Sequence, residues 1–143
     1  MRLSLNRNWV DTDGMLSITF SIERGDGYAM SQEVFVYPGT LQEFGYQLQK
    51  FPSSSSDEAV LEMGSQDEDA YSWVRLRAYV YDGSGHTALH VAANHNPSKH
   101  LQAGCQFSMP VEAASLNLLG AKIEAWSATP EIPFEFAYRA SHG

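Results

Sequence analysis

Histidines are the side chains in this sequence that most directly suggest chemistry. Four of the five lie between residues 86 and 100, and clustered imidazoles are typical of metal sites. The alternation of apolar and polar residues around them predicts strand, on which His86 and His90 point the same way but stand about 13 Å apart. That separation is too large for one ion. His95 and His100 flank a turn through Pro97, so a site built from several loops remains an alternative, and the sequence favours no metal.

The sequence contains no recognisable motif of a catalytic nucleophile or of a phosphate-binding loop. The segment 83–86, Gly-Ser-Gly-His, lacks the Gly-x-Ser-x-Gly spacing and the strand-to-helix context of a serine nucleophile. The sequence contains no phosphate-cradling glycine loop, no dinucleotide fingerprint and no Cys-x-x-Cys. Cys105 lies in an alternating apolar run, which predicts a buried structural thiol. The sequence therefore favours a non-enzymatic protein without a cofactor.

Aromatic and basic residues occupy every second position along one predicted strand, and histidines lie on its neighbour. Trp, Tyr and Arg are the residue types enriched at interface hot spots. These side chains share the face opposite the apolar one, so we predict that they form a partner-binding face. An ordinary solvated face with cross-strand pairs is the alternative. The predicted partner-binding residues are Tyr71, Trp73, Arg75, Arg77, Tyr79, Tyr81, His86 and His90.

The charge of the chain is strongly negative, at −8 from 17 acidic and 9 basic side chains. Nucleic-acid binding calls for a basic stripe, which this composition does not supply. A basic protein is the better electrostatic partner, because opposite net charge accelerates encounter; solubility alone is the alternative explanation. The residues predicted to steer such a partner lie in two polar loops and are Asp57, Glu58, Asp67, Glu68 and Asp69.

A spacing that occurs twice indicates which elements position these side chains. Each copy falls at i, i+3, i+4, i+7 and i+10, which places large apolar side chains on one face of a helix and a glycine among them. A glycine there lets the backbone of a packed neighbour approach closely. The two sets are Leu41, Phe44, Gly45, Leu48, Phe51 and Leu116, Leu119, Gly120, Ile123, Trp126.

The remaining elements are predicted from alternation and turn residues. The first helix is expected to begin at Thr40, whose capping box ends in Glu43, and to stop before Pro52. The second is expected to begin near Pro110 and to continue to Trp126. The strands are predicted at residues 15–24, 28–37, 59–63, 70–82, 87–93 and 101–109, with a short edge strand at 134–138.

These elements predict an α+β fold. We expect one domain over residues 1–143, with an ordered core at about 15–126. In it, two strand-helix halves share a core: a two-layer sandwich in which a twisted antiparallel sheet carries both helices on one face. The N-terminus lacks the apolar region of a signal peptide and no apolar run is long enough to span a bilayer. We therefore expect a cytoplasmic protein without a membrane partner.

Two segments resemble a known group of proteins. Residues 76–89, Leu-Arg-Ala-Tyr-Val-Tyr-Asp-Gly-Ser-Gly-His-Thr-Ala-Leu, and 107–120, Phe-Ser-Met-Pro-Val-Glu-Ala-Ala-Ser-Leu-Asn-Leu-Leu-Gly, resemble a family of small acidic bacterial α+β proteins of uncharacterised function. This likeness covers residues 34–126. More remotely, the order of elements is similar to that of WapI-type toxin immunity proteins. The resemblance implies a protein that neutralises a toxin by occlusion, and no catalytic residue carries over from it.

The sequence thus leads to one hypothesis and two alternatives. The hypothesis is a non-enzymatic protein-binding module, of the immunity type, whose partner is a protein such as a basic toxin. The first alternative is a structural or interaction subunit that associates with itself through edge strands or the exposed aromatic face. The second is a metal-binding or ligand-binding protein, built on the loops that contain the histidines.

Overall fold

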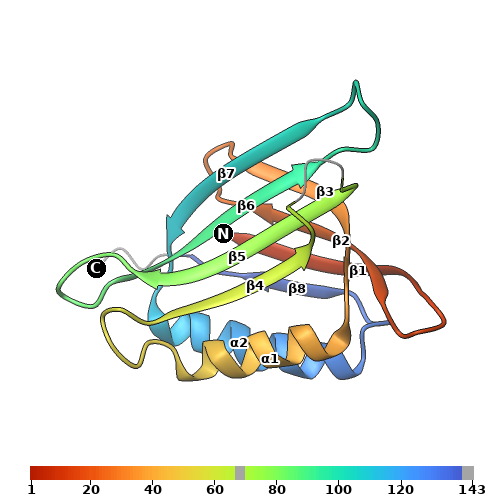
Figure 1. Cartoon of the computed structure of the whole chain (residues 1–143). Helices are drawn as coiled ribbons and strands as arrows, with labels where there is room; N and C mark the ends of the chain where they lie inside the picture. Colours follow the sequence, from red (N-terminus) through yellow and green to blue (C-terminus); the bar gives the residue numbers. More distant parts are fainter. Residues whose placement is uncertain (67–69, 140–143) are drawn as a thin grey trace.

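The computed structural model describes residues 1–66 and 70–139. Within these residues, the chain forms eight strands and two helices (Figure 1). The elements are β1 (Arg2–Val10), β2 (Leu16–Glu23), β3 (Ala29–Val36), α1 (Pro38–Lys50), β4 (Glu58–Gly64), β5 (Ser72–Val80), β6 (Thr87–His95), β7 (Ala103–Pro110), α2 (Ala113–Ala128) and β8 (Phe134–Ala137).

The described strands form two antiparallel four-stranded sheets, and each half of the chain contributes one strand to the sheet of the other half. Sheet A has the order β3-β2-β1-β8, and sheet B has the order β4-β5-β6-β7. The chain makes three strands of sheet A, crosses through α1 and adds β4 to sheet B. It then makes the rest of sheet B, crosses through α2 and returns to sheet A as β8. Each half, three strands, a helix and a strand, therefore completes the sheet of the other.

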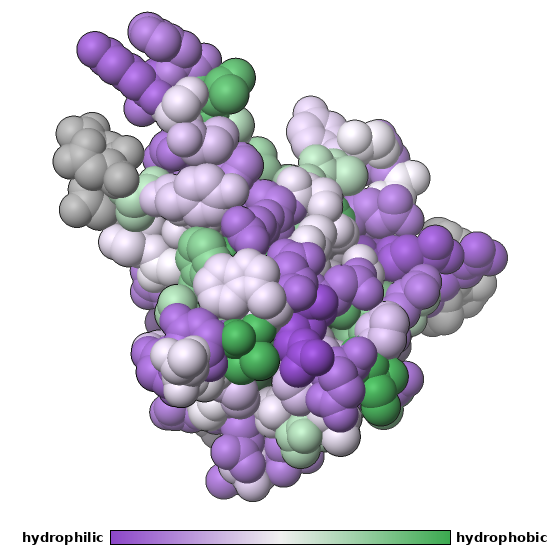
Figure 2. Space-filling model, turned by 90° about the vertical axis from the view of Figure 1, so that its right-hand side faces the viewer, coloured by the Kyte–Doolittle hydropathy of each residue, from purple (hydrophilic) through white to green (hydrophobic). Residues whose placement is uncertain are grey.

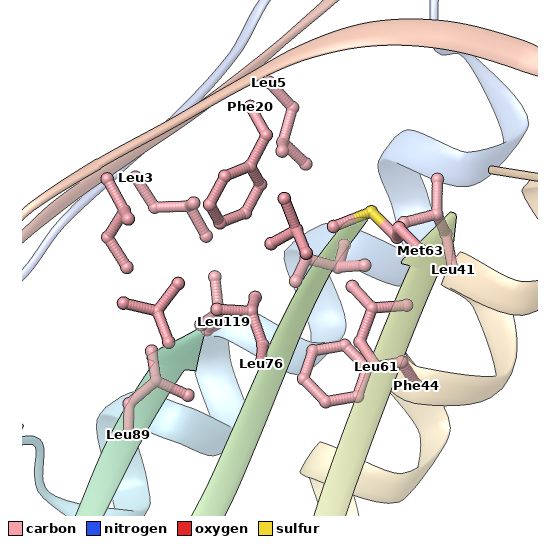
Figure 3. Packing of buried hydrophobic residues seen from close by; sticks show 14 of the residues in the cluster. Leu3, Leu5, Phe20, Leu41, Phe44, Leu61, Met63, Leu76, Leu89 and Leu119 are labelled. Atoms are coloured by element: carbon pink, nitrogen blue, oxygen red, sulfur yellow. The ribbon is translucent and has the colours of Figure 1, made fainter. Parts of the chain in front are cut away.

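The hydrophobic core lies between the inner faces of both sheets and the two helices. Figure 3 shows Leu3 and Phe20 of sheet A opposite Leu61 and Leu76 of sheet B, with Phe44 of α1 beside them. The alternation within each strand sends every second side chain into this space. Burial of one such side chain contributes on the order of 1.5–3 kcal/mol. The predicted apolar stripes of both helices are buried here, which confirms their role as core.

The two helices touch where their glycines meet. A Cβ atom built on Gly45 would lie 2.7 Å from the carbonyl oxygen of Gly120, and one built on Gly120 would lie 2.7 Å from the carbonyl oxygen of Gly45. Any larger residue at either position would collide with the backbone of the other helix. The repeated glycine is thus the contact point of α1 and α2, which lie side by side along one side of both sheets (Figure 1).

The sheets are also joined by polar contacts, at the point where β3 crosses β5 and β6. The side-chain amide of Gln32 donates hydrogen bonds to the hydroxyl of Ser72, at 2.9 Å, and to the carbonyl oxygen of Asn94, at 2.9 Å. Ser72 in turn donates to the carbonyl oxygen of Glu33. These bonds satisfy polar groups that the crossing removes from water. They fix β3 against sheet B, and this junction becomes important for the surface described below.

The α+β class, the antiparallel pairing and the two strand-helix halves are confirmed, whereas the expected single sheet is replaced by two. Alternation identifies which residues face the core, but it does not say which strand pairs with which. The strands β1 and β8 extend the ordered structure beyond the predicted core of 15–126 on both sides. The alternation of Leu3 and Leu5, both buried, is the sequence signal for β1 that the prediction did not use.

Both helices begin at residues other than the predicted ones. Helix α1 begins at Pro38, with Tyr37 as its N-cap, and no side chain caps it. The capping box at Thr40 is therefore wrong: Pro38 occupies the first helical position, for which its fixed φ is suited, and Thr40 already lies in the first turn. Pro110 ends β7 instead of opening α2, which begins after its N-cap, Glu112.

The prediction of a buried Cys105 is also wrong. Cys105 is exposed, because the first half of β7, an edge strand of sheet B, is exposed on both of its faces. Leu101, predicted on the same apolar face, is exposed as well.

In the described part of the chain, no helix is long and apolar enough to cross a membrane.

Candidate functional site

The outer face of sheet B presents the predicted partner-binding residues of β5 and β6. Strand register places Arg77 opposite His90, and Arg75 opposite Ala92, which in turn faces Gln106 of β7. Because side chains alternate along each strand, these residues all point away from the core. We call the following set the sheet B face: Trp73, Arg75, Arg77, Tyr79, His90 and Gln106.

Trp73 is anchored in the sheet B face and is not an exposed hot spot. Its residue is only 3% exposed. The indole N–H donates a 2.8 Å hydrogen bond to Oε1 of Glu62 on the neighbouring strand. The guanidinium carbon of Arg75 lies 5.7 Å from the centre of its ring, a cation–π contact. Trp73 therefore supports the residues around it, and an alanine at this position would test packing as much as binding.

Arg77 is paired within the sheet B face. Its Nε donates a 2.7 Å hydrogen bond to a carboxylate oxygen of Glu58, and its guanidinium carbon lies 4.7 Å from the ring centre of Tyr79. Both charged side chains are more than one-third exposed, so the pair contributes little to stability. Glu58, predicted to steer a partner, thus has a local partner of opposite charge, and Tyr79 is half-buried beneath Arg77.

A hollow of about 420 Å³ opens on the sheet B face. Its walls include Trp73, Arg75 and Asn94, and the small residues Ala92 and Gly104 leave room between them. Arg75 lines this hollow, and its Nε atom is buried and has no hydrogen-bond partner among the described residues. An unsatisfied buried donor costs free energy, so a group that accepts a hydrogen bond from Arg75 would be favoured here.

The other predicted residues of β6 and the β5–β6 turn have local contacts. The ring nitrogen Nε2 of His90 lies 3.2 Å from Oε1 of Gln106. In the turn, Nδ1 of His86 lies 2.6 Å from a carboxylate oxygen of Asp82, and the His86 ring stacks on Tyr81 with ring centres 5.9 Å apart. The backbone N–H of His86 is the main cause of a lowered pKa of Asp82, with the imidazole second. Tyr81 and His86 therefore form a separate pair beyond the end of β5.

Tyr71, at the opposite end of β5, belongs to a second surface that sequence reasoning missed. Its ring lies 6.0 Å from that of Phe35 in β3 and 5.2 Å from that of His95 in β6, and Phe35 lies 5.9 Å from Trp9 in β1. These centre-to-centre distances are within the range of attractive aromatic pairs. We call Trp9, Phe35, Tyr71 and His95 the aromatic ladder. It crosses from sheet A to sheet B.

Two acidic side chains make hydrogen bonds to residues in or beside the strands of the aromatic ladder. Glu33 accepts a 2.5 Å hydrogen bond from the hydroxyl of Ser17, and the carboxylate of Asp13 accepts a 2.7 Å bond from the hydroxyl of Tyr37. Desolvation, followed by hydrogen bonding to Glu33, raises the pKa of Tyr71. Figure 2 views this end of the molecule, where the β1–β2 turn lies, and shows pale and green surface bordered by hydrophilic purple surface.

Of the predicted steering residues, Asp57 also has a structural role. Its Oδ2 accepts hydrogen bonds from the backbone N–H of Ser53, at 2.8 Å, and from the hydroxyl of the same residue, at 3.1 Å. The first of these is the main cause of a lowered pKa of Asp57. The bonds close the loop between α1 and β4. The predicted steering residues Asp67, Glu68 and Asp69 lie outside the described residues.

Metal and thiol chemistry receive no geometric support from the residues that the structure describes. Across these residues, no three His, Cys, Asp or Glu side chains are grouped so as to hold a metal ion. Burial of part of Cys105 raises the pKa of its thiol, which keeps it protonated at neutral pH. A protonated thiol is a poor nucleophile, so Cys105 lacks the environment of a catalytic cysteine.

Comparisons with known proteins identify no family. No protein family model matches the sequence, and no curated protein matches it. Among solved structures, the chain is similar to a plant transcriptional regulator, PBF-2, with a TM-score of 0.47 and 10% sequence identity, over 88% of this chain and 72% of that chain. No functional argument follows from a similarity of this size.

Proposed function

We propose that this chain is a non-enzymatic protein-binding module that contacts its partner through the sheet B face. One observation carries the proposal: the hollow at Arg75, in which a buried donor without a partner lies beside Trp73 and two small residues. Hydrogen-bond acceptors such as main-chain carbonyl oxygens are present on every protein surface. A protruding loop of a partner would fill the hollow, and a turn of the Arg75 side chain toward it would bring Nε to an acceptor.

The partner in this proposal is a basic protein, and the interaction blocks the partner's own surface. The net charge of −8 supports long-range attraction of a basic protein. Glu58, which pairs with Arg77 at the rim of the sheet B face, and Asp57, which directly precedes it at the end of the loop before β4, contribute to this field. An immunity-type role, in which the chain neutralises a bacterial toxin by occlusion, is the specific form of the proposal that the sequence resemblance suggests.

Self-association is the second candidate, and one feature of β7 favours it. This strand is an edge of sheet B, and the first four of its residues are exposed. An exposed edge offers unpaired backbone groups to another strand. A second copy of the chain would pair there in antiparallel fashion and extend sheet B. Sedimentation equilibrium over a range of concentrations separates this candidate from a module that binds a different protein.

The test of the proposed function is affinity capture of the tagged protein from its native host, at low and high salt. We expect one stoichiometric basic partner, released by salt. In the variant Arg75→Ala, capture should fall by about tenfold, the loss expected when a charged hydrogen bond is removed. Tyr46→Ala, at a tyrosine that is 48% exposed on α1, is the matched control and should capture normally. Equal capture by both variants would overturn the proposal.

A further inference from the structure

The aromatic ladder combines exposed rings with carboxylates. Trp9 is 46% exposed and Tyr71 is 40% exposed, and both flank the ring of Phe35. A β-bulge between Arg7 and Trp9 shifts the register of β1, so that Trp9 lies opposite Ser17 on the outer face of sheet A. Small polar side chains follow the same face away from the rings, at Ser4, Thr19, Ser21 and Ser31, and the ion pair of Arg2 with Glu135 lies at its far end.

The rings of the ladder are not covered by the chain's own cations. Four cation–ring contacts occur in the described part of the molecule, and they use the rings of Tyr28, Trp73, Tyr79 and Phe136. Arginine covers three of those rings. Trp9, Phe35 and Tyr71 take part in none of these contacts, although they lie close to carboxylates. The exposed rings of Trp9 and Tyr71 therefore carry no cation of the chain's own, and a cation from another molecule can contact them.

Glu33 is the group that orients this surface toward cations. It lies two residues before Phe35 on the same face of β3, a rise of roughly 7 Å along the strand. A side chain that stacks on Phe35 can therefore direct its charged end toward the Glu33 carboxylate. Asp13, held by Tyr37 at the end of β3, adds a second negative charge nearby, and Asp11 in the same turn adds a third. Together these groups attract positive charge and repel phosphate.

We infer that the aromatic ladder binds an arginine side chain from a basic segment of a partner protein. The guanidinium plane stacks on Phe35 and Tyr71, and its N–H groups donate to Glu33. Arginine fits better than lysine because its planar group both stacks on rings and donates two parallel hydrogen bonds to a carboxylate. The inference relies on the proposed function for the nature of the partner, but it concerns a different surface from the sheet B face.

A single-stranded nucleic acid is the other class of molecule that stacks on exposed rings. Its phosphates would lie against Glu33 and Asp13, and the net charge of the chain is −8. Nucleic-acid binding depends on neutralising phosphate charge with lysine or arginine. The charge around the ladder thus favours the basic peptide, and the oligonucleotide becomes an outcome of the test.

The test is a titration of the intact protein with an eight-residue peptide of alternating arginine and glycine, followed by calorimetry at low salt. We expect Glu33→Gln and Tyr71→Ala each to weaken binding by about fivefold or more, as the loss of a carboxylate contact or a cation–π contact implies. The matched controls are Glu43→Gln and Tyr46→Ala on α1. Each control changes the same charge or ring elsewhere, and we expect less than about a twofold change.

Two outcomes would overturn the inference. Equal weakening by Glu33→Gln and Glu43→Gln would mean that the peptide responds only to net charge. Binding of a thymidine octamer that grows stronger in Glu33→Gln would assign the ladder to nucleic acid. If Tyr71→Ala does not fold, Trp9→Ala replaces it, because Trp9 is exposed and its removal leaves the junction of the sheets intact. Arg75→Ala should leave peptide binding unchanged, so the failure of one proposal is distinguishable from the failure of the other.

Discussion

The two halves of the molecule share their interior and differ in their outer faces. In the first half, strands β1 to β3 carry mostly serine, threonine and asparagine on the outside, such as Ser4 and Ser21. In the second half, β5 carries Trp73, Arg75 and Tyr79 on the outside. The helices cross at equivalent glycines and bury equivalent apolar stripes in both halves. Packing fixes the shared positions, whereas the outer faces are free to differ, and the features that suggest binding are found there.

The test with the largest expected effect shortens two core leucines, one in each helix. Leu41 and Leu116 hold the same place in the two helical stripes, and both are 0% exposed. We expect Leu41→Ala and Leu116→Ala each to lower the free energy of unfolding by about 3 kcal/mol, since each removes buried methyl groups and leaves a cavity. Urea denaturation measures both. Losses of unfolding free energy that differ by more than about 1 kcal/mol would contradict the equivalence of the two helical stripes.

A second test concerns the two tryptophans of the outer faces. Trp73 is buried beneath Arg75 and bonded to Glu62, whereas Trp9 is half exposed. We expect Trp73→Ala to lower the free energy of unfolding by about 3 kcal/mol and Trp9→Ala by less than about 1 kcal/mol. Thermal denaturation with circular dichroism compares them directly. A large loss at Trp9 would show that the aromatic ladder is structural, which would weaken the assignment of its rings to binding.

The helix crossing allows a sharper comparison at the level of single atoms. Alanine at Gly45 or at Gly120 would place a methyl group 2.7 Å from a backbone carbonyl oxygen of the other helix. We expect Gly45→Ala and Gly120→Ala each to destabilise the protein by about 2 kcal/mol, because overpacking outweighs the gain in helix propensity. Gly39→Ala, where a Cβ meets nothing within 4 Å, is the control and should cost little. A stabilised Gly120→Ala would show that the helices can move apart.

The test with the smallest expected effect concerns the loops that follow the two helices. Asp57 closes the first loop, whereas in the second the indole N–H of Trp126 donates a 2.5 Å hydrogen bond to the carbonyl oxygen of Ile132. The pKa of Asp57 is lowered from 3.8 in the folded protein, chiefly by the N–H of Ser53. Its contribution to stability is therefore complete above pH 3.8 and is lost as the pH falls through the lower folded value.

Removal of this carboxylate should flatten the acid limb of the stability profile. We expect Asp57→Ala to be slightly less stable than the wild type at neutral pH and to lose less stability as the pH falls below 3.8. Ser55→Ala, in the same exposed loop, should keep the profile of the wild type. Urea midpoints measured across this range give the comparison. Parallel profiles for the wild type and Asp57→Ala would show that the loop is closed by other contacts.

Local patterns predicted local structure well. The stripe around Leu41 and Leu116, the closely packed glycines and the outward direction of Arg75 all follow from periodicities of 3.6 and 2. The start of α1 does not follow from periodicity. Thr40 and Pro38 are competing start signals, and the helix begins with proline at its first position. Periodicity describes one element at a time, and it succeeded where a single element decides the outcome.

The candidate surfaces were predicted only where one strand supplies them. The sheet B face follows largely from the alternation of β5. The aromatic ladder takes its rings from three strands in two sheets and from the residue before β5, and Trp9 and Tyr71 meet the same ring, Phe35, only because β3 crosses sheet B. Their sequence positions carry no information about that crossing. The hollow at Arg75 likewise depends on which small residues, Ala92 and Gly104, the register places beside it.

The exchange of β4 and β8 between the halves determines how the molecule comes apart. If residues 1–64 separated from the rest, sheet B would lose β4 and sheet A would lose β8, and each sheet would expose a new edge together with its side of the core. A separation between the two halves therefore leaves neither sheet complete. Amide protons in β1 and β5, although they belong to different sheets, should therefore exchange with solvent through the same global opening and with the same free energy.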